Sequence, residues 1–419
     1  MSFKIFKNTV LLFVLVLISC GSQYANDSNN TNLSETESKN TEGDYGPIIV
    51  GANRTSNYLP LLNGKRVGIV ANQTSVIFTL RQAQGDNSYT HLVDSLVSLN
   101  VDVKKVFSPE HGFRGNADAG EHVEDGVDIK TGLPIISLHG KNKKPSIKQL
   151  EGIDIMIFDI QDVGVRFYTY ISTLHYIMEA CAENNIPLII LDRPNPNGNY
   201  VDGPTLEKEH QSFLGMHTIP LVHGMTIGEY AKMIHGEKWL PNGVQCNIEV
   251  IKMTDYLHSR NYSLPIRPSP NLPNDQSIKL YSSLGLFEGT NVNAGRGTEF
   301  QFQRYGAPFL NPETMPFTYT PQANFGAKYP KHKDVLCYGE DLSKAEVNDG
   351  MTLKWIIKAY KNSIDKSLFF NTDNFTKHAG TVTLQKQIES GMTEAEIKAT
   401  WQKDLESFKK TRSKYLIYN

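Results

Sequence analysis

The sequence predicts an α/β protein whose N-terminal half forms a mostly parallel sheet and whose smaller C-terminal domain is of the α+β class. Helical patterns of apolar residues occur at Leu92–Leu99 and Thr169–Glu183. They lie between four short apolar segments that predict strands, at Arg66–Ala71, Val101–Phe107, Ile153–Ile160 and Ile186–Leu191. Strands that alternate with helices in this way form βαβ units, so the N-terminal domain should be Rossmann-like in layout.

The pattern changes beyond about residue 212, which predicts two domains, residues 46–212 and 213–419. Thr226 with Glu229 has the capping-box spacing and predicts a helix running toward Trp239. Thr393 with Glu396 predicts a second helix that continues to about Arg412. A further segment, Leu133–Leu138, is a candidate strand of the first domain.

The N-terminus has the pattern of an exported lipoprotein. Lys4 and Lys7 precede the apolar run Val10–Ile18, and Cys20 follows in the position of a lipid-modified cysteine. The run is shorter than the roughly 20 residues that span a bilayer. We therefore expect a signal peptide with a lipid-anchor cysteine (1–20), a flexible polar tether (21–45) and a place in the bacterial cell envelope, held to the membrane through Cys20.

The composition excludes several function classes. The formal net charge of −2 argues against a nucleic-acid partner, which needs a basic surface. Beyond Cys20 only three cysteines remain, at wide spacing, which is no disulfide framework. The first strand runs into Asn72 without a glycine-rich turn, and no phosphate-binding or zinc motif occurs. We therefore expect neither a cofactor nor a metal ion.

Polar side chains follow each predicted strand of the N-terminal half. The carboxyl ends of strands in open α/β sheets carry ligand sites, so these side chains should meet in one cleft. The residues that we expect there are Asn72, Gln73, Glu110, His111, Asp162, Arg166, Tyr168, Asp192 and Arg193.

A C-terminal loop carries a second polar cluster. The segments Leu286–Asn291 and Ala294–Glu299 bring together glycines, two carboxylates and an arginine. Glycines permit a close backbone approach to a ligand. The residues of this cluster that we expect at the site are Glu288, Asn291, Arg296 and Glu299.

Two carboxyl groups of this kind suit the hydrolysis of a glycosidic bond. One protonates the leaving oxygen, and the other is a nucleophile or activates water. Glu110 is the best candidate for the acid, because Pro109 and Gly112 place it in a turn at a strand end. Asp162, Glu288 and Glu299 compete for the second role, and Tyr168 and Tyr170 are candidates for stacking on a sugar.

Five ordered motifs resemble the NamZ-like exo-β-N-acetylmuramidase family, formerly a domain of unknown function. They are Gly68–Thr74 (GIVANQT), Ser108–Gly115 (SPEHGFRG), Phe158–Tyr170 (FDIQDVGVRFYTY), Leu191–Pro196 (LDRPNP), and Leu286–Asn291 (LFEGTN) with Gly295–Thr298 (GRGT). The resemblance extends from about residue 48 to the C-terminal end. It implies a Rossmann-like domain, a smaller C-terminal domain and a cleft between them.

The resemblance also implies an activity, the release of N-acetylmuramic acid from the non-reducing ends of peptidoglycan fragments. It implies that Glu110 is the catalytic glutamate. Under this hypothesis Asp162 or Glu288 is the second carboxylate. An arginine fork pairs well with a carboxylate, so Arg166, Arg193 or Arg296 would bind the lactyl carboxylate of muramic acid.

Two other functions fit the sequence. Two α/β lobes on a tether also describe a solute-binding lipoprotein for wall sugars. A metal-dependent hydrolase would use Glu110, His111, His122 and Asp118, although their spacing matches no compact ligand motif.

Overall fold

The computed structural model describes residues 45–80, 87–115, 125–347 and 349–419. Gly46–Asn419 is one compact unit. The expected signal peptide and lipid-anchor Cys20 lie outside the described residues, as does the tether up to residue 44. Within the described part of the chain, no helix is both long and apolar enough to cross a membrane.

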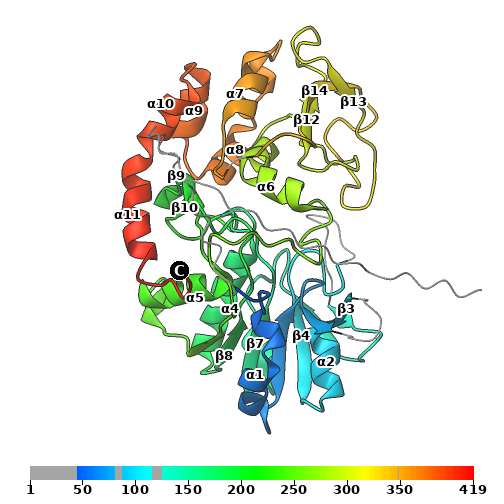
Figure 1. Cartoon of the computed structure of the whole chain (residues 1–419), viewed down its shortest axis with the longest axis vertical. Coiled ribbons are helices and arrows are strands. Elements are labelled where there is room, and N and C mark those ends of the chain that lie inside the picture. The colour runs from blue at the N-terminus through cyan, green and yellow to red at the C-terminus, as the bar shows by residue number, and fades with distance from the viewer. Residues whose placement is uncertain (1–44, 81–86, 116–124, 348) are drawn as a thin grey trace, which may run out of the picture. The chain divides into compact units, whose positions relative to one another are not determined.

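The central element is a seven-stranded sheet in the order β11-β8-β7-β1-β4-β6-β5 (Figure 1). Its strands are β1 (Val67–Ala71), β4 (Val103–Ser108), β5 (Gly126–Val127), β6 (Pro134–Ser137), β7 (Ile155–Asp159), β8 (Leu188–Leu191) and β11 (Ile248–Ile251). All neighbours pair in parallel except β5, which is antiparallel to β6. The predicted α/β fold class is confirmed, with strands at all five predicted places.

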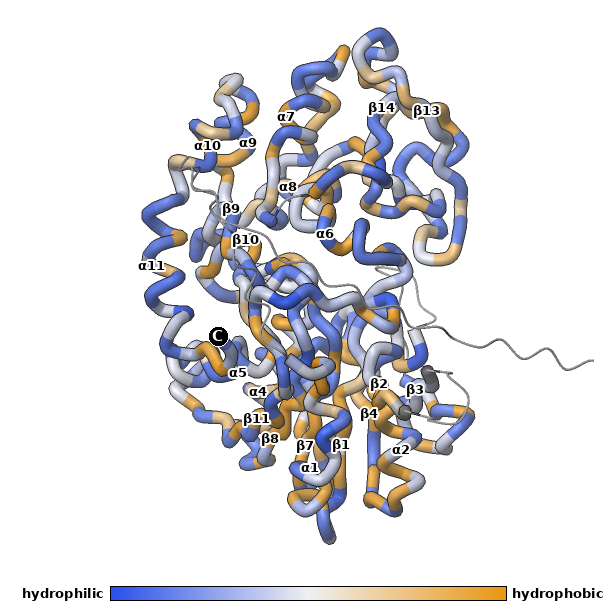
Figure 2. The backbone as a smooth tube through the Cα atoms, in the orientation of Figure 1, coloured by the Kyte–Doolittle hydropathy of each residue, from blue (hydrophilic) through white to orange (hydrophobic). Residues whose placement is uncertain are grey.

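Both faces of the sheet are buried at its centre, so β1 and β8 are apolar throughout and β7 is apolar up to its last residue (Figure 2). In β7, Met156 and Phe158 point to the face covered by α4 (Tyr170–Glu183) and α5 (Ile227–Gly236). Ile155 and Ile157 point to the opposite face, with α1 (Thr55–Leu62) and α2 (Leu92–Ser98). This three-layer arrangement explains the unbroken apolar runs in the sequence.

Some local predictions need adjustment. Between β1 and α2 the chain forms an antiparallel hairpin of β2 (Val76–Leu80) and β3 (Asn87–His91), which the sequence did not predict. Strand β11 comes after residue 212 in the chain and still joins the N-terminal sheet through β8. The boundary near residue 212 stays a prediction.

The C-terminal part contains a small antiparallel sheet in the order β12-β14-β13 and is α+β as predicted. Its strands are β12 (Arg304–Ala307), β13 (Phe317–Tyr319) and β14 (Cys337–Asp341). Its helices are α6 (Asp275–Leu284), η4 (Gly285–Gly289), α7 (Lys354–Lys361), η5 (Lys366–Leu368), α8 (Thr372–Ala379), α9 (Thr383–Glu389), α10 (Glu394–Thr400) and α11 (Gln402–Arg412). The remaining short elements are η1 (Gly51–Asn53), α3 (Ile147–Leu150), β9 (Asp202–Thr205), η2 (Lys208–His210), β10 (Pro220–Val222) and η3 (Pro241–Gly243).

Both predicted capping boxes are present, at Thr226 before α5 and at Thr393 before α10. The single helix predicted from Thr393 to Arg412 is wrong, because Trp401 interrupts it with φ −101° and ψ 0°. The Trp401 side chain is buried in the main apolar core, and the chain turns there from α10 into α11.

The C-terminal residues return to the N-terminal sheet after α11. The Tyr418 hydroxyl donates to Asp192 Oδ2 over 2.7 Å, and the backbone N–H of Ile417 donates to Glu229 Oε1 over 2.8 Å. Asp192 directly follows β8, so the last residues of the chain brace the edge of the sheet where the strands end.

Candidate active site

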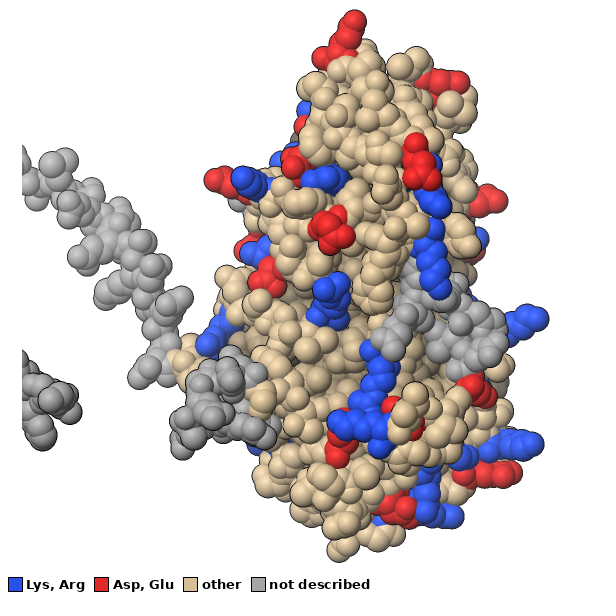
Figure 3. Space-filling model, turned by 90° about the vertical axis from the view of Figure 1, so that its right-hand side faces the viewer, with Lys and Arg blue, Asp and Glu red and all other residues tan. Residues whose placement is uncertain are grey.

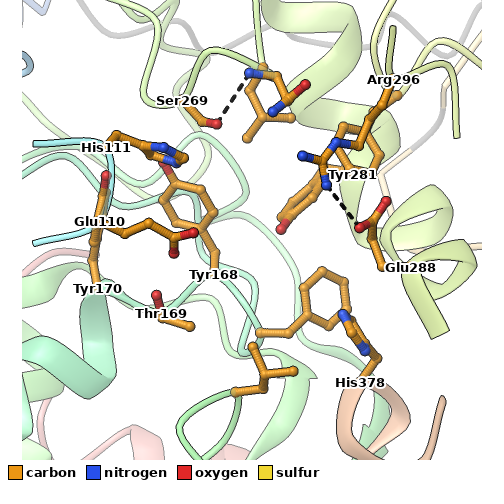
Figure 4. Close-up of a pocket in the computed structure, with 15 residues that line it drawn as sticks. Glu110, His111, Tyr168, Thr169, Tyr170, Ser269, Tyr281, Glu288, Arg296 and His378 are labelled. Carbon is orange, nitrogen blue, oxygen red and sulfur yellow. Dashed lines mark hydrogen bonds and ion pairs between the residues drawn. The ribbon is translucent and has the colours of Figure 1, made fainter. Parts of the chain in front are cut away.

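A cavity of about 280 Å³ lies where the loops after β4 and β7 meet the C-terminal elements (Figure 4). It is lined mainly by polar and aromatic side chains, with two leucines, from both parts of the unit. They are Glu110, His111, Phe167, Tyr168, Thr169, Tyr170, Leu214, Ser269, Asn271, Leu272, Tyr281, Glu288, Arg296, Phe302 and His378.

Glu110 comes from a tight turn after β4. His111 and Gly112 both have positive φ, 72° and 77°, and the Gly112 N–H donates to the Pro109 carbonyl over 3.2 Å. A non-glycine residue in this conformation is uncommon and often marks a functional site. The turn leaves Glu110 partly exposed, with its carboxylate directed into the cavity (Figure 4).

Two tyrosines form the wall beside Glu110. Tyr168 and Tyr170 pack edge to face with 4.9 Å between ring centroids. Burial raises the pKa of Tyr170, and the nearby Glu110 charge raises it further. The Glu110 carboxylate therefore lies close to the Tyr170 phenol.

Asn72 and Gln73 hold this wall in place and do not line the cavity, although we expected them to bind substrate. Asn72 Nδ2 donates to the Tyr170 hydroxyl over 2.9 Å. Gln73 Nε2 and the Tyr168 hydroxyl both donate to the Pro268 carbonyl, over 3.1 Å and 2.7 Å. The loop that contains Pro268 continues to Ser269 and Asn271, which do line the cavity.

The second carboxylate of the cavity is Glu288, on η4. Arg296 Nη1 pairs with Glu288 Oε2 over 3.1 Å (Figure 4). Burial alone would raise the pKa of Glu288, but the positive charges of Arg296 and Lys331 outweigh it and lower that pKa. Glu288 is therefore ionised at neutral pH.

His378, near the C-terminal end of α8, closes the cavity on the side of Glu288. Its Nδ1–H donates to the Asn374 carbonyl over 2.8 Å, and Asn374 Nδ2 donates to the Glu288 carbonyl over 2.9 Å. Burial lowers the pKa of His378. The helix therefore supplies a neutral imidazole to the cavity and supports the backbone of Glu288.

Arg193 and Asp192 do not line the cavity, and our expectation that they bind substrate is not supported. Arg193 pairs with Asp159 through two hydrogen bonds of 2.6 Å and 2.9 Å, and both side chains are buried. Asp192 accepts hydrogen bonds from Thr226, Gly228 and Tyr418. Both residues are occupied in bracing the strand ends.

Arg166 is also directed away from the cavity. It is fully buried, and its guanidinium donates at 2.7–3.1 Å to four backbone carbonyls. Two of these carbonyls, of His378 and Ala379, end helix α8, where the helix dipole favours a cation. The arginine that we proposed as a carboxylate binder therefore joins the N-terminal domain to α8.

Asp162 is buried and does not line the cavity. Its Oδ2 accepts the Gly164 N–H over 2.7 Å and lies 3.8 Å from His223 Nε2. Burial raises the pKa of Asp162 to about 7. This position is poorly suited to direct contact with a sugar, in contrast to Glu288.

The last two predicted residues are outside the cavity lining. Asn291 Nδ2 donates to the Leu368 carbonyl over 2.7 Å, and Glu299 is exposed. Asp118 and His122, considered as metal ligands, lie outside the described residues. Over the ranges that are described, no three His, Cys, Asp or Glu side chains are grouped so that they could hold a metal ion.

Comparison with known proteins places this arrangement in a family. The family described as exo-β-N-acetylmuramidase NamZ matches with its N-terminal domain at residues 67–276 and its C-terminal domain at residues 279–418. The chain belongs to the NamZ exo-β-N-acetylmuramidase family. The peptidoglycan β-N-acetylmuramidase NamZ of Bacillus subtilis strain 168 is 41% identical over an alignment of 385 residues, which covers 86% of this chain and 89% of that protein.

Two crystal structures of DUF1343-family proteins from Bacteroides fragilis NCTC 9343 have the same fold. One superposes with a TM-score of 0.80 at 44% identity, the other with 0.73 at 28% identity. In each comparison 89% of this chain and 99% of the other chain are covered. The resemblance inferred from five sequence motifs is thereby confirmed.

Within this NamZ-family fold, six of the fourteen predicted site residues line the cavity: Glu110, His111, Tyr168, Tyr170, Glu288 and Arg296. Sequence reasoning missed others, including Ser269, Asn271, Tyr281 and His378. The proline-rich stretch around Pro268 carries no motif that marks Ser269 or Asn271, and α8 carries none that marks His378. The cavity therefore offers two carboxylates in different surroundings, an arginine and several aromatic rings.

Proposed function

We propose that this chain is an exo-acting glycoside hydrolase that releases N-acetylmuramic acid from the non-reducing ends of peptidoglycan fragments. Membership of the exo-β-N-acetylmuramidase family carries the proposal. The cavity agrees with it, because it carries the two carboxylates that glycoside hydrolysis commonly uses.

Glu110 is the proton donor in this proposal. Its proton passes to the glycosidic oxygen as the bond from that oxygen to the anomeric carbon breaks, so that the remaining saccharide leaves as a neutral alcohol. The turn at His111 and Gly112 fixes the direction of the carboxyl group. The buried side chains of Tyr168 and Tyr170 form the wall beside it.

Glu288 is the second carboxylate that we favour over Asp162. Its lowered pKa keeps it ionised, so its charge can stabilise the oxocarbenium-like centre and accept a proton from the attacking water. Asp162 lies outside the cavity lining, and its raised pKa reflects burial. Glu299, the other competitor, is exposed and also outside the lining.

Arg296 is the arginine that we assign to the lactyl carboxylate of muramic acid. Of the three arginines considered, it alone lines the cavity. Its guanidinium is oriented by Glu288 and by the Gly326 carbonyl, at 3.1 Å and 3.3 Å. A pre-oriented guanidinium discriminates a substrate with a carboxylate from one that lacks it.

The size of the cavity favours attack at chain ends. Ligand pockets typically measure roughly 300–1,000 Å³. A cavity of about 280 Å³ is just below that range and suits one sugar unit. A muramic acid at the end of a chain can enter, whereas one in the middle of a chain would need room for a neighbour on each side.

The experiment is product analysis with a tetrasaccharide of alternating N-acetylmuramic acid and N-acetylglucosamine, with muramic acid at its non-reducing end. We expect free N-acetylmuramic acid and a trisaccharide as the first products, identified by mass spectrometry. The matched control is a tetrasaccharide that begins with N-acetylglucosamine, which should stay intact. Release of a disaccharide or of N-acetylglucosamine first would contradict the proposal.

A solute-binding lipoprotein is the second candidate, because the cavity lies between elements of the two parts of the chain. Binding of both tetrasaccharides without any hydrolysis would favour it. The two carboxylates of the cavity argue for the hydrolase, because glycoside hydrolysis commonly uses such a pair and binding alone does not need it.

We also propose that the mature chain is attached to the bacterial cell envelope by a lipid on Cys20. The support is the basic start, the apolar run and the cysteine that follows it. Mass spectrometry of the mature N-terminal peptide should show a diacylated or triacylated cysteine. A Cys20→Ala variant should leave the membrane fraction, and an unmodified Cys20 in the wild type would exclude the anchor.

A further inference from the structure

If the cavity holds one sugar unit, the rest of the glycan must lie on its rim. This inference rests on the proposed function, because it takes a muramic acid in the cavity as given. The question is which part of the rim contacts the sugar on the leaving side of the cleaved bond. The structure offers two interlocked C-terminal loops, residues 294–300 and 321–334, with unusual surface chemistry.

The loop 321–334 is attached directly to the cavity lining. The Gly326 carbonyl accepts a hydrogen bond from Asn271 Nδ2 over 2.6 Å and from Arg296 Nη2 over 3.3 Å. Asn271 and Arg296 both line the cavity. Gly326 has φ +95°, and a Cβ there would lie 2.7 Å from Pro270, so only glycine allows this approach. The loop is therefore part of the rim.

The loop is also held rigidly at both ends. The Gln322 N–H donates to the Gly297 carbonyl over 2.8 Å, and Asn324 Nδ2 donates to the Thr298 carbonyl over 3.1 Å. Beyond the turn, the Lys331 ammonium donates to the carbonyls of Phe287 and Thr290, over 2.8 Å and 2.6 Å. Side chains on such a loop are presented in a fixed place.

Exposed aromatic rings concentrate on these two loops. Tyr329 is 91% exposed, Phe325 57% and Phe300 40%. Elsewhere in the described chain only two aromatic side chains, Tyr45 and Tyr89, are comparably exposed. An exposed large ring on a fixed loop loses hydrophobic free energy unless a ligand covers it, so the concentration indicates a binding surface.

The charge distribution fits a sugar better than a strongly charged partner. Figure 3 views the side on which β13 and β14 lie in Figure 1, and it shows charges of both signs scattered over a mainly uncharged surface. An N-acetylated sugar is neutral, with an apolar face that can pack on an aromatic ring and polar groups at its edge. Near the two rings, the exposed Gln322 offers an amide group for that edge.

We propose that Phe325 and Tyr329 form a platform for the sugar unit on the leaving side of the cleaved bond, an N-acetylated amino sugar of the glycan. The cavity selects the terminal unit, and the platform selects substrates in which another sugar follows it. The platform contributes to binding of the longer substrate only, because a small aglycone does not reach the rim.

The test compares kcat/KM for a methyl β-N-acetylmuramide with kcat/KM for the tetrasaccharide. For a Phe325→Ala/Tyr329→Ala double variant, we expect the tetrasaccharide value to fall roughly tenfold, the scale of one or two aromatic contacts. The value for the methyl glycoside should change less than about twofold, as for an ordinary surface substitution. Tyr329→Phe should keep most of the activity, because it keeps the ring.

Tyr89→Ala is the matched control, an exposed tyrosine on β3 that does not line the cavity. It should change neither value. Equal losses on both substrates, or no loss on the tetrasaccharide, would overturn the platform while the proposed hydrolase stands. If the wild-type protein hydrolyses neither substrate, the proposed function fails and the platform fails with it.

Discussion

The ends of β7 and β8 and the end of β4 carry similar polar residues, yet the structure uses them in opposite ways. After β7 and β8, Asp159 and Arg193 are buried against each other, and Asp192 is held by α5 and the C-terminal residues. After β4, Glu110 is directed into a cavity with Glu288 and Arg296 opposite (Figure 4).

The difference lies in what each charge is paired with. Asp159 and Arg193 neutralise each other, so their pairing holds two strand ends together and leaves little charge for a ligand. Glu110 and Glu288 face a common space, where a substrate can take part in the charge balance. The comparison predicts that variants of the first group lower stability and that variants of the second lower activity.

The largest effect should come from Glu110→Gln. Removal of a general acid lowers kcat by about 10²–10⁴. The fold should be unaffected, because Glu110 is partly exposed in a surface turn. Muramic acid release from the tetrasaccharide gives the rate, and the thermal midpoint is the control. More than about a tenth of wild-type activity in this variant would remove Glu110 from the role.

The next largest effect should be a loss of stability when the buried Asp159–Arg193 pair is broken. Asp159→Asn leaves the Arg193 guanidinium buried without its carboxylate, which should lower the free energy of unfolding by about 3–5 kcal/mol. Urea unfolding measures this value, with Glu406→Gln in the exposed Lys409–Glu406 pair as the matched control. A small change in stability together with a large loss of activity would move Asp159 into the catalytic group.

Asp162 tests the comparison through the pH dependence of protein stability. Its folded-state pKa of about 7 lies above that of the unfolded chain, so the folded protein binds its proton more tightly. This contribution to stability is present below about pH 4 and is lost as the pH rises to about 7. Because an amide does not titrate, Asp162→Asn should gain stability relative to wild type between pH 5 and 8, by a few kcal/mol.

The neighbouring His223 also titrates, because burial lowers its pKa to about 3. The free energy of unfolding should therefore be measured at several pH values for both proteins, and the difference between wild type and Asp162→Asn should be compared. A difference that does not vary with pH would show that Asp162 is ionised throughout.

The smallest effect should be a shift of the pH profile in an Arg296 variant. The charge of Arg296 helps to lower the pKa of Glu288, so Arg296→Gln should shift the acidic limb of the kcat/KM profile upward by about one pH unit. As the pH falls, the variant would then lose activity at a higher pH than wild type, because its Glu288 becomes protonated earlier. Lys331→Met, which removes a charge that also lowers this pKa, should shift the limb in the same direction. An unchanged limb would exclude Glu288 as the group that titrates there.

Most of the sheet could be predicted because its central strands are buried on both faces and contain unbroken apolar segments, such as residues 155–158. Glu110 could be predicted because Pro109 and Gly112 mark the turn beside it. The position of Arg166 could not be predicted from the sequence. Arg166 is held by the carbonyl of Ala379, 213 residues away in sequence, and no local pattern reveals such a partner.

The same limit explains the missed residues. His378 and Asn271 reach the cavity only because α8 and the loop after Pro268 pack against distant parts of the chain. Glu288 could be predicted as a site residue because glycines lie close to it in the sequence. Its ion pair with Arg296 could not be predicted, because that pair depends on how the loop folds.

The most direct test of the central claim is the leaving-group dependence of Glu110→Gln. A dinitrophenolate leaves without needing a proton, whereas a sugar hydroxyl needs one. The variant should therefore cleave dinitrophenyl β-N-acetylmuramide at a rate within about tenfold of wild type, while its cleavage of the tetrasaccharide falls by about 10²–10⁴. Equal losses on both substrates would contradict the assignment of Glu110 as the proton donor.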